Sequence, residues 1–343
     1  MSQIIGATLS LSEAEELAYV VRNGFVESRH AGAAVVTGPD GEVLAQVGPS
    51  QSLIYPRSTL KPFQAIASLR LGAELSDEQV ALTCGSHKAT RRHRDLAESV
   101  LTQIGLTARD LQCPADWPGY KEDIAAEAAD VAAHLERTPL AYNCSGKHAA
   151  FLAACVAAGE DTGTYLDPEH PLQREVNAVI EEYCGEQIAH LGMDGCGAPA
   201  PVTSLAGLAR GIGRVASAPG RRDAELHAAR VASAMLDHPW AVHAPNASNT
   251  VVMRELGILA KLGADGVMVM GAPDGTAVAV KALDGGSRAG NLVALALIAQ
   301  FAPDYVDTEA LTRVLQSVVP GVMGRGTPVG SVQLGKPVLE LIG

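Results

Sequence analysis

Short runs of strand-forming apolar residues occur in two pairs that lie far apart in the chain. Each pair flanks a turn that contains Pro-Asp-Gly, in which Pro fixes one backbone angle and Asp and Gly tolerate the conformations that follow. Each pair therefore predicts a β-hairpin. The paired segments are 31–37 with 42–47, and 266–271 with 276–282.

Between the hairpins, apolar residues recur mostly with the spacing of amphipathic helices. Asp77 and the Gly/Pro clusters at 195–201 and 218–220 mark points where helices begin or end. The longest apolar run, 291–302, is also helix-like, and a last strand is expected at 330–334 or 337–342. The other predicted helices are 60–71, 77–84, 93–104, 148–158, 171–183 and 224–238.

Strands at both ends and helices between them predict an α/β fold of the α+β type. We expect a largely antiparallel sheet built from the N- and C-terminal segments, with the helices packed on it. We interpret residues 1–343 as a single catalytic domain in which a helical sub-region, about 59–240, is inserted between the sheet-forming ends. Gly211-Ile212-Gly213 does not follow a clear strand, so we interpret it as a helix C-cap loop and not as a dinucleotide fingerprint.

Composition limits the classes of function. The chain has 343 residues and a net charge of −12, which argues against nucleic-acid and anionic-membrane partners. No apolar run reaches the length of a membrane span, and the first residues lack the pattern of an export signal, so we expect a cytoplasmic protein. The six cysteines do not form a disulfide-scaffold pattern and are expected to be buried thiols, metal ligands or reactive groups.

Ser58 and Lys61 are the first candidates for chemistry. At this spacing the amine and the hydroxyl share one face of a helical turn, and Pro62 places Ser58 at or just before the first turn. Only seven of the 26 basic residues are lysines, and a lysine can lose its proton whereas arginine cannot. Ser58 and Lys61 could therefore form a Ser–Lys nucleophile. The alternative is that Lys61 is an ordinary solvated lysine.

Two further groups of residues could join this site. Ser86 follows a predicted helix, and Lys281 ends an apolar strand, as a lysine that faces the nucleophile in Ser–Lys enzymes of the β-lactamase type would. Cys144, Lys147 and Cys196 could hold tetrahedral Zn²⁺ through two thiolates and a neutral amine. From spacing alone, buried thiols are the more frequent explanation of the cysteines.

Together these stretches resemble the rhizobial-type L-asparaginase II family, whose fold is similar to that of serine β-lactamases, penicillin-binding proteins and serine glutaminases. The resemblance runs in family order over about residues 20–290, and its most specific part is 143–148, Asn-Cys-Ser-Gly-Lys-His. The other matching pieces are Val26-Glu27-Ser28 with His30, Pro56-Arg57-Ser58 with Lys61-Pro62, Ser86-His87, His170-Pro171-Leu172-Gln173, Asp194-Gly195-Cys196, and Lys281 with Asp284-Gly285.

The resemblance implies an enzyme that hydrolyses L-asparagine to L-aspartate and ammonia through an acyl-enzyme, as a homodimer with a zinc site near the substrate. It assigns a role to each candidate residue. Ser58 is the nucleophile and Lys61 its base, Ser86 and Lys281 form a second pair, Arg57, Asp194 and His148 bind substrate, and Cys144, Lys147 and Cys196 bind Zn²⁺.

Two departures from the family pattern concern substrate preference. Lys88-Ala89-Thr90 replaces a Gly-Glu-like continuation after Ser86-His87, and Ala247 stands where the family usually has an arginine in the loop 243–250. The alternatives are therefore the same chemistry on glutamine or a modified asparagine, or an amino-acid-binding protein without turnover. A β-lactam-processing enzyme is disfavoured by the absence of an export pattern.

Overall fold

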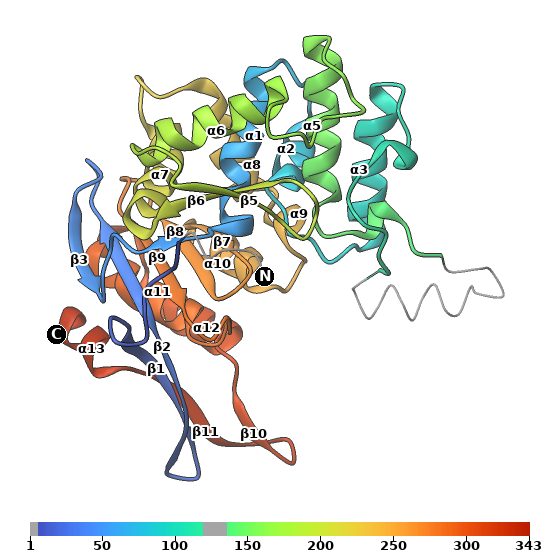
Figure 1. Ribbon diagram of the computed structural model, residues 1–343. Coiled ribbons are helices and arrows are strands. Elements are labelled where there is room, and N and C mark those ends of the chain that lie inside the picture. Colours follow the sequence, from blue (N-terminus) through green and yellow to red (C-terminus); the bar gives the residue numbers. More distant parts are fainter. Residues whose placement is uncertain (1–5, 119–135) are drawn as a thin grey trace.

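Strands from the two ends of the chain form one eight-stranded antiparallel sheet. The computed structural model describes residues 6–118 and 136–343. The strand order is β10-β11-β1-β2-β9-β8-β7, with β3 paired to β2 (Figure 1). The fold is therefore of the predicted α+β type with a largely antiparallel sheet. The strands are β1 (Glu15–Arg22), β2 (Phe25–Thr37), β3 (Val43–Val47), β7 (Leu259–Leu262), β8 (Val267–Gly271), β9 (Ala277–Ala282), β10 (Val322–Gly324) and β11 (Thr327–Leu334).

Both predicted hairpins are confirmed, as β2–β3 and β8–β9. The carboxyl-terminal half of β2 is buried on both faces and pairs with β9, which joins the two ends of the chain into one sheet. The last strand is β11, whereas residues 337–342 belong to a helix. A proline at the second position of that helix suits its first turn, where no intrahelical N–H donor is needed.

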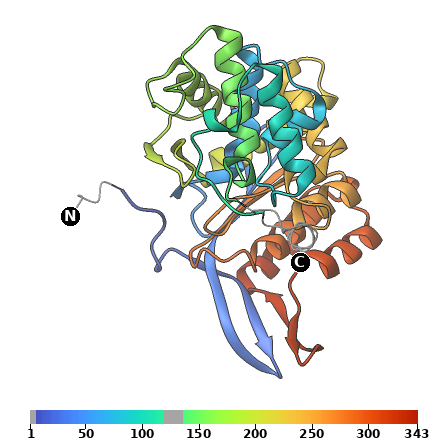
Figure 2. The same ribbon diagram turned by 90° about the vertical axis from the view of Figure 1, so that its right-hand side faces the viewer.

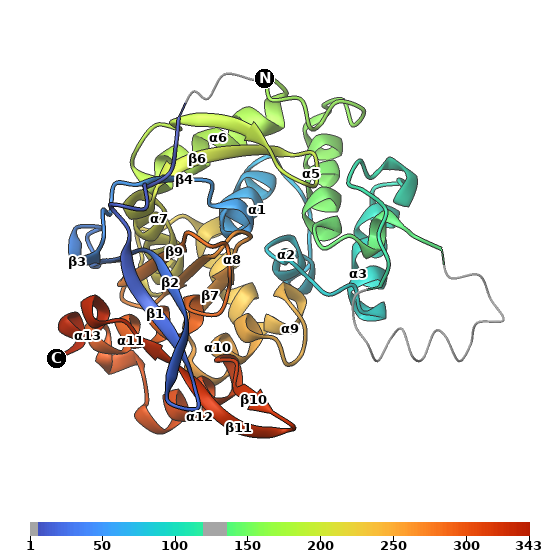
Figure 3. The same ribbon diagram turned by 60° about the horizontal axis from the view of Figure 1, so that its bottom comes forward.

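Helices cover the sheet and form the upper body of the molecule in Figure 1. All the predicted helices are present, and Figure 3 shows α1, α2 and α5 next to one another. The helices are α1 (Lys61–Arg70), α2 (Asp77–Thr83), α3 (Arg91–Gln103), α5 (Ser145–Ala158), α6 (Pro171–Cys184), α7 (Leu205–Ser217), α8 (Leu226–Asp237), α9 (Pro239–Val242), α10 (Ser248–Leu256), α11 (Gly290–Phe301), α12 (Thr308–Val318) and α13 (Lys336–Ile342).

The paired glycines of the Gly-Ile-Gly segment lie inside α7, so the interpretation of that segment as a C-cap loop was wrong. Helix α7 packs so closely on the β8–β9 turn that a Cβ atom on Gly213 would collide with the Gly275 carbonyl group. A Cβ on Gly211 would meet the Phe63 ring. Gly213 thus permits close packing of α7 on the sheet, and Gly211 permits close packing of α7 against α1.

A second, three-stranded antiparallel sheet has the order β4-β6-β5. Its strands are β4 (Leu53–Ile54), β5 (His190–Met193) and β6 (Pro199–Ser204), so the Gly/Pro cluster at 195–201 leads into a strand. The hairpin β1–β2 and the hairpin β10–β11 extend together away from the helical body (Figure 2). Within residues 6–118 and 136–343, the helices are all too short or too polar to cross a membrane.

Candidate active site

The Ser58-x-x-Lys61 segment forms the turn that enters α1. A 3₁₀ turn, η1 (Arg57–Leu60), precedes the helix, and Lys61 is the first residue of α1. Lys61 is only 1% exposed, which contradicts the alternative of an ordinary solvated lysine. Its Nζ donates to the Gly85 carbonyl oxygen, and lies 3.2 Å from Ser86 Oγ and 3.4 Å from the Asn143 carbonyl oxygen. Lys61 thus connects the start of α1 to the loop that carries Ser86.

Ser86 lies between two buried amines. The second is Lys261 on β7, whose Nζ is 3.1 Å from Ser86 Oγ and 2.6 Å from the Leu262 carbonyl oxygen. Complete burial, and then the neighbouring charge of Lys61, hold the pKa of Lys261 well below its usual range. A neutral Lys261 amine can accept a proton, which makes it a candidate base beside a hydroxyl.

These contacts show that the predicted pairing of Ser86 with Lys281 is wrong. Lys281 lies on β9, is partly exposed, and donates to the Asp265 carbonyl oxygen. The strand lysine that reaches Ser86 is Lys261, which was not among the residues predicted from the sequence. A signal was available in Lys261-Leu262-Gly263, since β-lactamase-type enzymes carry their strand lysine in a Lys-Thr-Gly motif.

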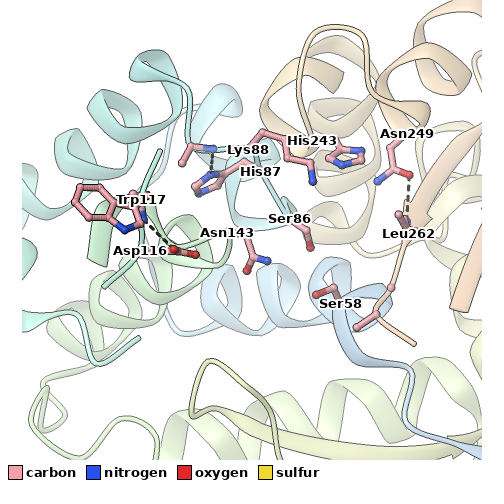
Figure 4. A pocket seen from close by; sticks show the side chains of 14 residues that line it. Ser58, Ser86, His87, Lys88, Asp116, Trp117, Asn143, His243, Asn249 and Leu262 are labelled. Atoms are coloured by element: carbon pink, nitrogen blue, oxygen red, sulfur yellow. Dashed lines mark hydrogen bonds between the residues drawn. The ribbon is translucent and has the colours of Figure 1, made fainter. Parts of the chain in front are cut away.

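Both serines line one cavity of about 350 Å³. Figure 4 shows the Ser58 and Ser86 hydroxyl groups close together, with Asn143 beside them. The wall combines residues from η1, the loop after α2, the start of α10 and the loop after β7. The full lining is Ser58, Ser86, His87, Lys88, Ala89, Asp116, Trp117, Ala141, Asn143, His243, Asn249, Leu262, Gly263 and Ala264.

Arg57 and Asp194 contact each other and lie outside this lining. The Arg57 guanidinium donates to Asp194 Oδ1 over 2.8 and 3.0 Å and also to Asp265 Oδ2. Burial opposes ionisation of Asp194, but the charges of Lys147 and Arg57 lower its pKa overall. Arg57 has a φ of +56°, a left-handed conformation that costs energy in a non-glycine residue and is frequent at functional sites.

The predicted zinc ligands come together in the structure. Lys147 Nζ lies 3.1 Å from Cys196 Sγ, and Cys144 Sγ lies 3.0 Å from Asn143 Oδ1. All three proposed ligands are at most 4% exposed. Two sulfur donors and one amine are a chemically suitable set for tetrahedral Zn²⁺ with one open position. The described ranges, 6–118 and 136–343, contain no group of three His, Cys, Asp or Glu side chains that could hold a metal.

Cys144, Cys196 and Lys147 shift one another's pKa values. A hydrogen bond from the Cys196 thiol, above all, lowers the pKa of Cys144, while the pKa of Cys196 is raised. Burial opposes the charge on Lys147, but the cysteine sulfurs raise its pKa overall. A bound metal would have to replace the Lys147 proton, since only the neutral amine can be a ligand.

His148 lies in the core and is not part of the cavity lining. Its Nδ1 is 2.7 Å from the Tyr165 hydroxyl group, and its ring packs against Phe151. The buried Nε2 atom has no hydrogen-bond partner within the described residues. Burial and the charges of Lys147 and Lys61 keep the pKa of His148 well below its usual range. The structure therefore does not bring His148 to the serines as a substrate contact.

Comparisons with known proteins describe the relatives of this chain. No curated protein matches it. Similar solved structures include native Mglu, with 14% identity over 79% of this chain and 64% of that chain at a TM-score of 0.43. A β-lactamase from Mycobacterium bovis has 16% identity over 80% of this chain and 95% of that chain, at a TM-score of 0.37. A putative β-lactamase from Bacteroides dorei has 17% identity over 83% of this chain and 93% of that chain, at a TM-score of 0.40. The L-asparaginase II family model matches residues 18–334, and the chain belongs to this family.

Proposed function

We propose that the protein is an amidohydrolase that cleaves the side-chain amide of L-asparagine to L-aspartate and ammonia. The observation that carries the proposal is the Ser86 hydroxyl group held between two buried lysine amines, Lys61 and Lys261, in the cavity that Ser58 also lines. Membership of the L-asparaginase II family supports an amino-acid amide as the substrate.

In this mechanism Ser58 Oγ attacks the amide carbon, and its proton passes to the linked group of Lys61, Ser86 and Lys261, in which Lys261 is the amine whose pKa is lowered. Ser86 joins Lys61 to Lys261 through contacts of 3.2 and 3.1 Å, and this chain of hydroxyl and amine groups can return a proton to the departing nitrogen. Ammonia leaves, an ester forms on Ser58, and water hydrolyses this ester to release aspartate.

The tetrahedral intermediate carries a negative oxygen that needs hydrogen-bond donors. The backbone N–H group of Ala264 is a suitable donor, because Ala264 lines the cavity and its N–H has no acceptor within the described residues. Ala264 follows β7 directly after Gly263, so it lies on the same segment as Lys261.

The proposal includes a Zn²⁺ site formed by Cys144, Lys147 and Cys196. These residues would hold the ion, and it would supply fixed positive charge beside Asn143 and Asp194. No step above depends on it. The buried-thiol alternative for the cysteines makes the opposite prediction about metal content.

An ammonia assay over a panel of amides tests the proposed function. The panel contains L-asparagine, D-asparagine, L-glutamine and a side-chain N-methylated asparagine. We expect the highest kcat/KM for L-asparagine. Preference for glutamine or the modified amide would assign the same machinery to another substrate. Tight asparagine binding by calorimetry without ammonia release from any amide would instead indicate an amino-acid-binding protein.

A further inference from the structure

An amino-acid substrate in this cavity needs a partner for its α-carboxylate group, and Arg57 is already occupied. Two carboxylate groups, from Asp194 and Asp265, accept hydrogen bonds from its guanidinium. Arg57 is also absent from the cavity lining. The inference below rests on the proposed function in one respect, namely that the ligand is an amino acid.

Lys88 is the cation that the cavity wall offers. Its side chain is exposed, and its amine has no ion-pair or hydrogen-bond partner among residues 6–118 and 136–343. Its backbone N–H group donates to the His243 carbonyl oxygen over 3.0 Å, which fixes the start of the side chain against the opposite loop. Figure 4 shows the Lys88 amine above Ser86 and next to His243.

Asn249 provides an unpartnered donor at the same wall. It is 1% exposed, and its Oδ1 atom accepts a hydrogen bond from the Leu262 backbone N–H over 3.1 Å. This bond fixes the orientation of the amide group, because the oxygen must face the N–H donor. The Nδ2 group then has no acceptor within the described residues. Because Asn249 lines the cavity, this NH₂ group can donate a hydrogen bond to a ligand there.

The surroundings favour an anionic ligand. Asn249 lies in the first turn of the nine-residue helix α10, whose N-cap residue, Ala247, offers no side-chain acceptor. The first turn of a helix carries partial positive charge. His243 lies between Lys88 and Asn249 in Figure 4, with a buried Nδ1 atom that has no partner in the described part of the chain. Lys88 and two side chains with an unpartnered polar atom, His243 and Asn249, therefore line the same cavity.

We propose that Lys88 and Asn249 bind the α-carboxylate group of the amino-acid substrate and thereby select substrates that carry one. Lys88 supplies the charge, and Asn249 supplies an oriented N–H donor from the opposite side of His243. The amide to be cleaved then points toward Ser58 and Ser86. Asp116, on the other side of the cavity in Figure 4, forms no ion pair with Lys88 and does not neutralise it.

Equilibrium binding of L-aspartate and β-alanine tests this proposal without requiring turnover, because the two compounds differ only by the α-carboxylate group. By calorimetry, we expect the wild-type protein to bind aspartate at least ~10-fold more tightly than β-alanine. Lys88→Gln should weaken aspartate binding by ~10-fold or more and change β-alanine binding by less than ~3-fold. The pair L-glutamate and 4-aminobutyrate applies the same test to a longer substrate.

Asn249→Asp is a second, nearly isosteric variant. It keeps an oxygen acceptor for the Leu262 N–H group but replaces the donor with a negative charge, so it should weaken aspartate binding even more strongly than Lys88→Gln. Lys336→Gln, on the exposed helix α13, is the matched control and should change neither affinity.

Equal affinities of the wild-type protein for the two members of each pair would overturn the proposal. So would a Lys88→Gln variant that keeps its preference for the carboxylate-bearing compound, or binding of neither compound. Ammonia release measured on the same preparations separates this outcome from failure of the proposed function. If the protein releases ammonia but does not prefer the carboxylate-bearing compounds, only the proposed carboxylate site is wrong. If it prefers these compounds but releases no ammonia, only the proposed activity is wrong.

Discussion

Four of the seven lysines of this chain lie at the candidate active site. Lys61 and Lys261 contact Ser86, Lys147 contacts Cys196, and Lys88 lines the cavity. Arginine carries most of the remaining positive charge. This distribution fits chemistry, because of the two residue types lysine can give up its proton in a protein site and arginine cannot. The scarcity of lysine therefore indicated a site, but it did not distinguish Lys261 from Lys281.

A short local motif placed Ser58 and Lys61 on one turn, whereas the convergence of Cys144, Lys147 and Cys196 was predicted by the family resemblance. The sequence did not predict Lys261. Strand β7 is only four residues long, and its lysine interrupts an apolar run, whereas Lys281 ends a longer and more regular strand. Which lysine reaches Ser86 depends on the position of β7 at the sheet edge beside η1, and local sequence does not encode this position.

Replacing Lys261 by Met should make the pH dependence of stability shallower. Folding lowers the pKa of Lys261, so at pH values between its folded and unfolded pKa the unfolded state binds more protons than the folded state. Wild-type stability therefore rises with pH, by up to about 1.4 kcal/mol per pH unit, until the pH reaches the ordinary lysine pKa of about 10.4. The free energy of unfolding of Lys261→Met, relative to that of wild type, should thus be highest at pH 7 and should fall as the pH approaches 10.

Denaturant unfolding of both proteins at pH 7, 8 and 9 measures this difference. Lys336→Met, at an exposed position, serves as the control and should show no such trend. A difference between wild type and Lys261→Met that stays constant from pH 7 to 9 would show that Lys261 is charged in the folded protein.

At the scale of elements, the site exists because three short segments meet. The turn η1 presents Ser58, the loop after α2 presents Ser86, and β7 presents Lys261. The hydrophobic pattern predicted the two hairpins and most of the long helices, because their apolar faces are buried. It did not predict β1, β7, α7 or α12, since their burial depends on partners distant in sequence.

Gly213 in α7 gives a test of the close packing between helix and sheet. A Cβ atom there would collide with the Gly275 carbonyl group, which belongs to the backbone and cannot rotate away. Gly213→Ala should therefore lower the free energy of unfolding by about 2–4 kcal/mol, although alanine favours helices. Gly220→Ala is the control, because its added Cβ has no atom within 4 Å. Equal stability of the two variants in urea would contradict the packing described here.

At the scale of the whole molecule, β2 and β9 join the two ends of the chain, and the helical region lies between them in sequence. The cavity is formed by residues from both the helical region and the segment that follows it, including Asn249 and Leu262. Strands at both ends and helices in the middle predicted this architecture. The contact of Arg57 with Asp194 and Asp265 could not be predicted, since it depends on segments that approach only in the folded chain.

Metal content tests the role of the two cysteines and Lys147 in the folded molecule. We expect about one Zn²⁺ per chain in the purified protein and substantially less in Cys144→Ser and Cys196→Ser. Removal of the ion by a chelator should lower the unfolding temperature by about 5 °C, because binding to the native state alone stabilises it. Cys155→Ser, another buried cysteine, should keep its metal. A wild-type protein without metal after dialysis against zinc would leave the cysteines as buried thiols.

The most direct test of the central claim is ammonia release from L-asparagine by Ser58→Ala, with Ser331→Ala on the exposed strand β11 as the control. The account predicts that Ser58→Ala loses at least ~10³-fold in kcat/KM, because no ester can form, while aspartate affinity changes by less than ~3-fold. Ser331→Ala should match wild type. Turnover by Ser58→Ala within ~10-fold of wild type would contradict Ser58 as the nucleophile and direct attention to Ser86.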